Sequence, residues 1–185
     1  FFEGQNWLKI MHTPYLPDLN EQVSKSKIKE FIEANELVFN ERISGLAKRI
    51  HEKKEIKIVL ISGPSSTGKT TTTKRLASYL KTLGYQTIPI SVDDYYKDGE
   101  EIPKLENGEF DFESLNAIDT KLFNEDLQAL LNGEKVNLPI YDFIIQKKNR
   151  RANAVQMDEN SILLIEGLHG LNEELTNSVE EEKKF

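Results

Sequence analysis

The sequence predicts an α/β fold in which a parallel β-sheet is flanked by helices. Short apolar runs rich in β-branched residues, typical of buried strands, occur at residues 56–62, 85–92 and 161–165. Helical patterns of apolar residues separate these runs, and strands that alternate with helices build parallel sheets. Polar residues follow each run, at the strand ends where such sheets bind ligands.

The first 55 residues are expected to form an N-terminal extension or connector. Residues 1–22 contain Pro14 and Pro17 and show no clear period, which predicts an irregular lead-in. Residues 24–35 and 41–54 look helical, and the second range carries an apolar stripe at helical spacing: Ile43, Leu46, Ala47 and Ile50. These helices are interpreted as covering one edge of the core.

An octet after the first predicted strand, Gly63-Pro64-Ser65-Ser66-Thr67-Gly68-Lys69-Thr70, fits the phosphate-binding loop pattern G-x-x-x-x-G-K-[ST]. Its two glycines let the backbone turn tightly and approach a phosphate. Its N–H groups and the next helix N-terminus surround a polyphosphate with donors and partial positive charge. Lys69 adds a charge at the β- and γ-phosphates, and the Thr70 hydroxyl can ligate Mg²⁺.

This octet predicts a P-loop NTPase-type sheet that binds ATP or GTP with Mg²⁺. The alternative is a Gly/Ser-rich turn before a helix, but the strand and the helix on either side favour the phosphate-binding loop. The predicted nucleotide-binding residues are Gly63, Ser65, Ser66, Thr67, Gly68, Lys69, Thr70 and Thr71.

The remaining elements follow in alternation within a predicted kinase-like domain over residues 56–185. Residues 71–83 form a helix that Gly84 ends, and residues 117–132 form another before Gly133. Pro89 indicates either the end of the second strand or an edge strand, and residues 135–151 are predicted to form a small β-hairpin insertion. Three core strands are few for this fold. We therefore expect a C-terminally incomplete domain and a fragment of a longer polypeptide.

Composition excludes several functional classes. The chain has 185 residues, a net charge of −7 and no cysteine, which excludes disulfides, cysteine–zinc sites and thiol catalysis and fits a reducing cytoplasm. No run of about 18 apolar residues occurs, so no membrane span is expected. A basic footprint is missing, so no nucleic-acid partner is expected. Self-association into a homo-oligomer stays open.

Carboxylates follow the second and third predicted strands. Asp93 or Asp94 could accept the proton of an attacking hydroxyl and help to hold Mg²⁺, although Asp is also common in turns. Glu166 could hold Mg²⁺ or its waters, although it could also be an exposed strand end. His169 lies near Glu166. The basic run at 147–151 could pair with phosphates or form a solvated hairpin.

Five motifs in order resemble the uridine kinase and phosphoribulokinase family. They are the octet at 63–70, Ser91-Val92-Asp93-Asp94-Tyr95-Tyr96, the stretch 111–119, Leu138-Pro139-Ile140-Tyr141-Asp142-Phe143, and Ile165-Glu166-Gly167. The likeness covers residues 56 to about 172. A GTPase is disfavoured, because no Asp has Gly three residues later and no Asn-Lys-x-Asp occurs.

The resemblance implies roles for single residues. Asp93 is the catalytic base, Tyr96 lies near the nucleoside, and a carboxylate at Glu113 grips the ribose hydroxyls. Tyr141 lies against the nucleobase, and Glu166 lies near Mg²⁺.

The sequence departs from the family at two places. In the stretch 111–119, Ser114-Leu115 replaces a His-Pro pair, and Glu113 replaces an Asp with a longer side chain, so that Asp111 could act in its place. Gln146 replaces the histidine that reads the pyrimidine in uridine-cytidine kinases.

The function expected from these residues is Mg-dependent transfer of the γ-phosphoryl group of ATP or GTP to a nucleoside-like small molecule, with the 5′-hydroxyl of uridine or cytidine as acceptor. Lys69 and Asp93 are the expected catalytic residues, and Tyr96, Glu113, Tyr141 and Gln146 the expected acceptor contacts. Two alternatives stay open: the same fold acting on a phosphopentose or pantothenate-like alcohol, and a regulatory nucleotide-binding module without kinase activity.

Overall fold

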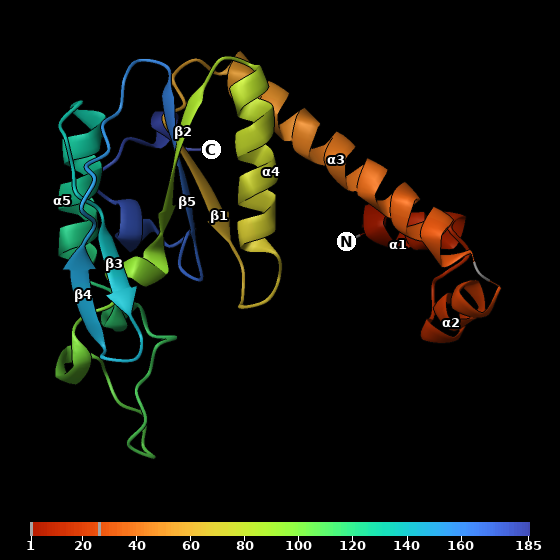
Figure 1. Cartoon of the computed structure of the whole chain (residues 1–185), viewed down its shortest axis with the longest axis horizontal. Coiled ribbons are helices and arrows are strands. Elements are labelled where there is room, and N and C mark those ends of the chain that lie inside the picture. The colour runs from red at the N-terminus through yellow and green to blue at the C-terminus, as the bar shows by residue number, and fades with distance from the viewer. Residues whose placement is uncertain (1, 26) are drawn as a thin grey trace. The chain divides into compact units, whose positions relative to one another are not determined.

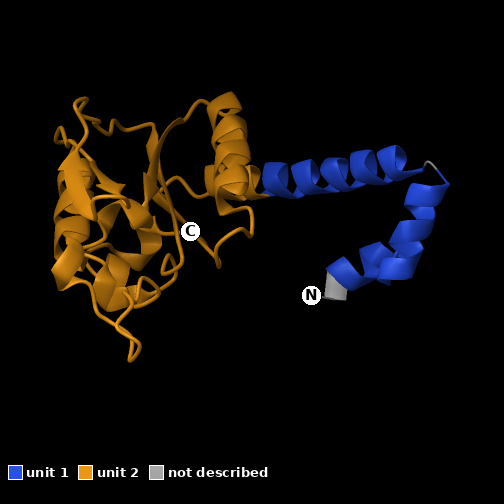
Figure 2. Cartoon of the chain, turned by 60° about the horizontal axis from the view of Figure 1, so that its bottom comes forward, with its two compact units in different colours: residues 1–45 blue, residues 46–185 orange. Residues whose placement is uncertain are grey.

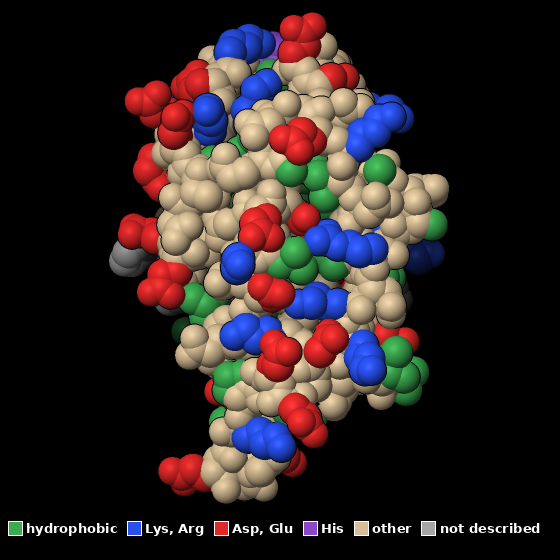
Figure 3. Space-filling model, turned by 90° about the vertical axis from the view of Figure 1, so that its left-hand side faces the viewer, with side chains coloured by type: hydrophobic (Ala, Val, Ile, Leu, Met, Phe, Trp, Pro, Cys, Tyr) green, Lys and Arg blue, Asp and Glu red, His purple; other side chains and the backbone are tan. Residues whose placement is uncertain are grey.

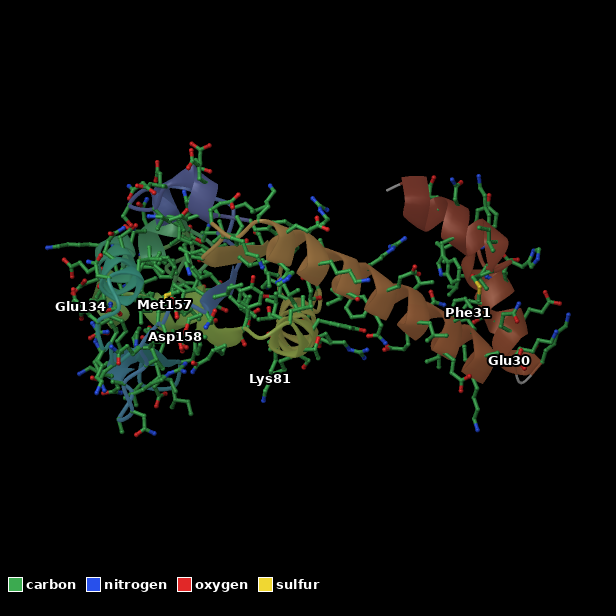
Figure 4. The ribbon with its side chains drawn as sticks, turned by 90° about the horizontal axis from the view of Figure 1, so that it is seen from above. Glu30, Phe31, Lys81, Glu134, Met157 and Asp158 are labelled. Atoms are coloured by element: carbon green, nitrogen blue, oxygen red, sulfur yellow. The ribbon has the colours of Figure 1, made fainter. Side chains whose placement is uncertain are left out.

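The computed structural model describes residues 2–25 and 27–185, which form two compact units, 1–45 and 46–185 (Figure 2). The first unit holds α1 (Phe2–Ile10), α2 (Leu16–Ser24) and most of α3 (Ile28–Glu52), which continues into the second unit. Figure 4 labels Glu30 and Phe31 in the first turn of α3.

The prediction of an irregular lead-in over residues 1–22 is wrong. Two helices occupy most of this range, and Pro17 lies within the first two positions of α2. Proline is well tolerated there because the N–H that it lacks would have no partner inside the helix. The two helices expected at 24–35 and 41–54 are one continuous helix, α3; residues 1 and 26 lie outside the described part of the chain.

The second unit has the predicted α/β architecture. Its parallel sheet has the order β1–β5–β2, formed by β1 (Ile58–Ser62), β5 (Ser161–Gly167) and β2 (Gln86–Ser91). The helices α4 (Lys69–Thr82) and α5 (Thr120–Leu131) lie on opposite sides of it (Figure 1). Central β5 is the most buried strand, with Leu163, Leu164 and Ile165 fully covered.

Edge positions in this sheet explain several local features. Pro89 occurs in β2, an edge strand, where a residue without an N–H is tolerated. At the other edge, Phe185 exchanges backbone hydrogen bonds with β1, donating to the Ile58 carbonyl (3.0 Å) and accepting from the Leu60 N–H (3.0 Å). Residues 184–185 thus extend the sheet beside β1 in the parallel sense.

Helix ends follow the predicted signals. Gly84 and Gly133, directly after α4 and α5, adopt the positive φ angles of 92° and 76° that glycine favours. The Asp119 side chain caps α5 by accepting from the Leu122 N–H at 3.1 Å. Beyond α5, Met157 is buried close to Gly133 and leads through Asp158 into β5, as Figure 4 shows beside Glu134.

The predicted hairpin insertion is confirmed. It consists of β3 (Pro139–Asp142) and β4 (Lys147–Arg150), which pair antiparallel outside the main sheet. Short 3₁₀ turns occupy the loops around it, including η1 (Val92–Tyr95) directly after β2. In the part of the chain that the structure describes, none of the helices is both long and apolar enough to serve as a membrane span.

Candidate active site

The loop from Gly63 to Thr70 joins β1 to α4 at the carboxyl end of the sheet, the lower end in Figure 1. Gly68 has φ 87°, which a side chain would strain, and a Cβ at Gly63 would lie 3.0 Å from the Thr67 hydroxyl. Ser65, Ser66 and Thr67 are exposed. The loop therefore presents its backbone at a helix N-terminus, an arrangement suited to binding a polyphosphate.

Lys69 and Thr70 open α4 beside this loop, and Thr71 follows on its exposed first turn. The Lys69 ammonium donates to the Pro64 carbonyl at 2.9 Å, which holds the cation over the loop. The Thr70 hydroxyl donates to the Glu166 carboxylate at 2.8 Å. Two segments almost a hundred residues apart therefore meet at this point.

The sheet register explains why Glu166 reaches the loop. Because β5 lies between β1 and β2, Glu166 is level with Ile61 on one side and Ser91 on the other. Its oxygen atoms and the Thr70 hydroxyl are hard donors of the kind that Mg²⁺ prefers. No trio of His, Cys, Asp or Glu side chains within residues 2–25 and 27–185 forms a metal cage. Magnesium fits here, since it commonly takes one or two protein ligands plus phosphate and water.

Asp93 follows β2 on the η1 turn. Although the residue reaches solvent, burial of its carboxylate raises the pKa above the ordinary value; Lys69 opposes this shift, and Glu166 and Asp94 add to it. The charge of His169 also acts on Asp93, and the His169 Nε2 is buried without a hydrogen-bond partner among the described residues. The predicted base is therefore grouped with the phosphate-binding lysine and with Glu166.

A cluster of aromatic rings surrounds Tyr96, whose hydroxyl interacts with the charge of Asp93. Tyr96 forms edge contacts with Phe112, Tyr141 and Phe143 at centroid distances of 5.0, 5.5 and 5.8 Å. Its hydroxyl donates to the Phe112 carbonyl at 2.9 Å. Burial, followed by the nearby Asp93 carboxylate, raises the pKa of Tyr96 to about 12. We call Tyr96, Phe112, Tyr141 and Phe143 the aromatic cluster.

Two members of this cluster, Phe112 and Phe143, were not predicted as site residues. Phe112 lies in the motif at 111–119 and Phe143 in the motif at 138–143. Their closeness in sequence to Glu113 and Tyr141 could have identified them as site residues. Phe143 is 56 % exposed, whereas Tyr141 is 5 % exposed and its hydroxyl has no partner among the described residues. The cluster therefore combines covered and open aromatic surface.

Glu113 and Asp111 differ in what their side chains do. Asp111 Oδ1 accepts the backbone N–H groups of Glu113 (3.2 Å) and Ser114 (3.1 Å), so this oxygen is engaged in its own turn. The Glu113 side chain is exposed, and its charge acts on the Tyr96 hydroxyl. The Glu113 carboxylate is therefore the more open of the two, and the second oxygen of Asp111 has no hydrogen bond among those described.

Gln146 lies in the turn directly before β4, in a left-handed conformation with φ 52°. Its carbonyl accepts the Gly99 N–H at 3.0 Å, and its side-chain Oε1 also faces Gly99. In the described part of the chain, no hydrogen bond joins its side chain to the aromatic cluster. The structure thus groups Asp93, Tyr96 and Tyr141 but does not bring Gln146 into contact with them.

The basic run at 147–151 is held by carboxylates of the same unit. Lys148 pairs with Asp119 (2.7 Å), Arg150 with Asp126 (2.6 Å) and Arg151 with Asp94 (2.7 Å). Figure 3, which views this side of the molecule, shows Lys and Arg side chains interspersed with Asp and Glu. Three of the four cations of this run therefore fasten the hairpin to the domain.

Comparison with known proteins shows which family the chain belongs to. Residues 58–181 match the Phosphoribulokinase / Uridine kinase family over more than half of the chain. The chain belongs to this family. The match includes the octet, Asp93, the hairpin and Glu166, so family membership and site geometry concern the same residues.

Individual relatives of the family resemble the chain over part of their length. A uridine kinase of Borrelia duttonii is 32 % identical over 113 residues, 61 % of this chain and 52 % of its own length. A uridine kinase of Leuconostoc citreum is 29 % identical over 129 residues, 69 % of this chain and 60 % of its own length. The chain thus spans about half to three fifths of the length of these two relatives.

A solved structure supports the fold. A possible uridine kinase from Bacillus stearothermophilus aligns with a TM-score of 0.62 and 23 % identity, covering 76 % of this chain and 77 % of that one. At this identity the likeness concerns the arrangement of the sheet and helices, which confirms the predicted parallel sheet flanked by helices.

Proposed function

We propose that this chain provides the catalytic site of a Mg-dependent kinase that transfers the γ-phosphoryl group of ATP or GTP to a nucleoside hydroxyl. The acceptor proposed is the 5′-hydroxyl of uridine or cytidine. The observation that carries the proposal is that the Asp93 carboxylate, on the turn directly after β2, lies close enough to both Lys69 and the Tyr96 hydroxyl for its charge to interact with each. A base near both a phosphate-binding lysine and an aromatic cluster suits a hydroxyl attached to a planar ring system.

The proposed reaction needs few chemical groups. The acceptor oxygen bonds to the γ-phosphorus while the bond from that phosphorus to the β–γ bridging oxygen breaks, and the nucleoside diphosphate leaves. Asp93 takes the proton of the attacking hydroxyl. Lys69 and the loop N–H groups neutralise the charge that develops on the transferred group.

Thr70 and Glu166 are the residues that would hold Mg²⁺. When bound, the ion supplies neutralisation of phosphate charge. The Thr70–Glu166 hydrogen bond keeps these two oxygen ligands together and orients each of them.

Acceptor contacts are assigned to the aromatic cluster and Glu113. Phe143, which is 56 % exposed, offers ring surface for a nucleobase, and Tyr141 packs against it at a centroid distance of 4.9 Å. Aromatic stacking contributes about 0.5–1.5 kcal/mol beyond burial. The Glu113 carboxylate can accept hydrogen bonds from ribose hydroxyls. Both relatives described above are uridine kinases, which agrees with this acceptor class.

One observation keeps a second acceptor class in view. Gln146 contacts Gly99, so a pyrimidine-reading role for it rests on sequence position alone. A different small alcohol on the same fold, such as a phosphopentose or pantothenate-like compound, is the second candidate. The aromatic cluster favours the nucleoside, because a sugar phosphate has no flat ring to stack.

An acceptor screen tests the proposal. The full-length protein is incubated with ATP or GTP, Mg²⁺ and a panel of nucleosides, phosphopentoses and pantothenate-like alcohols, and products are identified by mass. Asp93→Asn should lower kcat on the best acceptor by about 10²–10⁴-fold while nucleotide affinity stays unchanged. Nucleotide hydrolysis without any phosphorylated acceptor would refute the kinase, and near-normal turnover of Asp93→Asn would refute the base.

A further inference from the structure

Asp94, the neighbour of the proposed base, makes contacts that the reaction itself does not require. Its Oδ1 accepts the backbone N–H of Tyr141 at 3.2 Å, and its Oδ2 accepts from the Arg151 guanidinium at 2.7 Å. Arg151 in turn donates through Nε to the Pro139 carbonyl at 3.2 Å. One carboxylate on η1 therefore holds both sides of the β3–β4 hairpin.

This bridge connects the two halves of the proposed site. Asp94 and Asp93 are consecutive residues of the same 3₁₀ turn, whereas Tyr141 lies on β3 in the aromatic cluster. The Asp94 side chain is 19 % exposed, and hydrogen bonds to charged groups gain strength when water is partly excluded. A shift of the hairpin away from η1 would therefore break two contacts to one carboxylate.

The other two ion pairs of the hairpin have their carboxylates on α5 and its N-cap. Lys148 reaches Asp119 at the start of α5, and Arg150 reaches Asp126 within α5. They fasten the hairpin to the helix that flanks the sheet. Of these three pairs, only the Arg151–Asp94 pair has its carboxylate on the turn that carries the base. Asp126 reaches that turn only by accepting the Tyr95 hydroxyl at 3.1 Å, a bond that does not involve Arg150.

We propose that Asp94 is a positioning residue that sets the distance between the acceptor-binding hairpin and Asp93. The inference rests on the proposed function and deepens it, because Asp94 would affect how tightly the acceptor binds without contacting the acceptor itself. Loss of the bridge leaves the phosphate-binding loop intact and loosens the hairpin. Acceptor KM therefore changes, while nucleotide affinity does not.

Asp94→Asn tests this with little change in shape, because the amide oxygen can still accept the Tyr141 N–H. Arg151→Gln removes the other partner, and the double variant completes the cycle. We expect acceptor KM to rise about tenfold in each single variant and no further in the double, because both changes remove the same contact. Nucleotide affinity should stay within about twofold of wild type.

Arg150→Gln is the matched control. It removes a cation from the same hairpin, one residue away, and should lower thermal stability while acceptor KM stays within about twofold. Kinetics are measured at a pH above the titration of Asp93, since the Asp94 charge also acts on that carboxylate. Hydrogen exchange of residues 139–150 is recorded in parallel and should be faster in Asp94→Asn and Arg151→Gln.

The outcomes separate the inference from the proposed function. An active wild type with unchanged acceptor KM in both single variants overturns the positioning role alone. Additive effects in the double variant, or an equal KM rise in Arg150→Gln, also overturn it. A wild type that phosphorylates no acceptor overturns the proposed function and the acceptor role together, and unchanged exchange in the variants would then also reject the bridge.

Discussion

Gly167→Ala tests whether close packing fixes the two carboxylate segments of the site. A Cβ on Gly167 would lie 2.6 Å from Val92 Cβ and 2.9 Å from Val92 Cγ2. Carbon atoms in contact normally stand about 3.5–4.0 Å apart, so the segments must separate by about 1 Å. Gly167 follows Glu166, and Val92 precedes Asp93. The same shift therefore moves a proposed metal ligand and the proposed base apart.

The expected loss of stability follows from overpacking of a core position. Val92 is 1 % exposed, and overpacking of this kind costs about 1–3 kcal/mol. For a chain of this size each kcal/mol lowers Tm by about 2–4 °C, so Gly167→Ala should unfold about 2–12 °C earlier in calorimetry. A displacement of about 1 Å should also reduce kcat by about 10²-fold.

Gly45→Ala is the control with the same chemical change. A Cβ there meets nothing within 4 Å, and the position lies inside α3, so alanine should stabilise the chain by about 0.4–1 kcal/mol. A Gly167→Ala variant with the Tm and kcat of wild type would refute the packing argument.

Two further predictions concern protons. Because burial raises the pKa of Asp93, and a base must be ionised, kcat/KM should fall as the pH drops through a value above that of an ordinary aspartate. His169→Gln removes a charge that lowers this pKa, so its acid limb should move to higher pH; a limb that stays or moves lower contradicts the assignment. Burial alone would raise the pKa of Asp119, but its hydrogen bond from Lys148 and the Leu122 N–H lower it. These contacts stabilise the fold at pH values above the pKa of Asp119 in the unfolded chain. Their contribution is lost as the pH falls through the lower pKa of Asp119 in the folded chain. Asp119→Asn should therefore lower the unfolding free energy by about 0.5–1 kcal/mol near neutral pH and by less in acid, as measured by urea titration at both pH values.

Local features of the chain could be predicted from sequence, because they depend on neighbours in the sequence. The octet at 63–70, the strand that ends at Glu166 and the glycines after α4 and α5 all carry their signal within a few residues. The prediction of an irregular lead-in was wrong because prolines alone do not determine whether a segment is helical. Pro17 lies at the start of α2, where proline is compatible with a helix.

Contacts between distant segments could not be predicted. Asp94 and Arg151 are 57 positions apart, and nothing in either neighbourhood identifies the other as its partner. The run at 147–151 showed that charge was present but not which carboxylates it would meet. Phe112 and Phe143 likewise belong to the site because of where their loops meet, which is a property of the fold.

The sheet order explains why the two halves of the proposed site are held in place by different parts of the fold. The phosphate loop and Glu166 come from β1 and β5, and the base follows β2, so the donor half is fixed by the register of the sheet itself. The acceptor contacts come from the loop at 110–113 and from the β3–β4 hairpin, which lie outside that register. A substitution in the loop or the hairpin is therefore expected to change the proposed acceptor contacts without disturbing the donor half. The bridge through Asp94 is the point where the two halves are tied together.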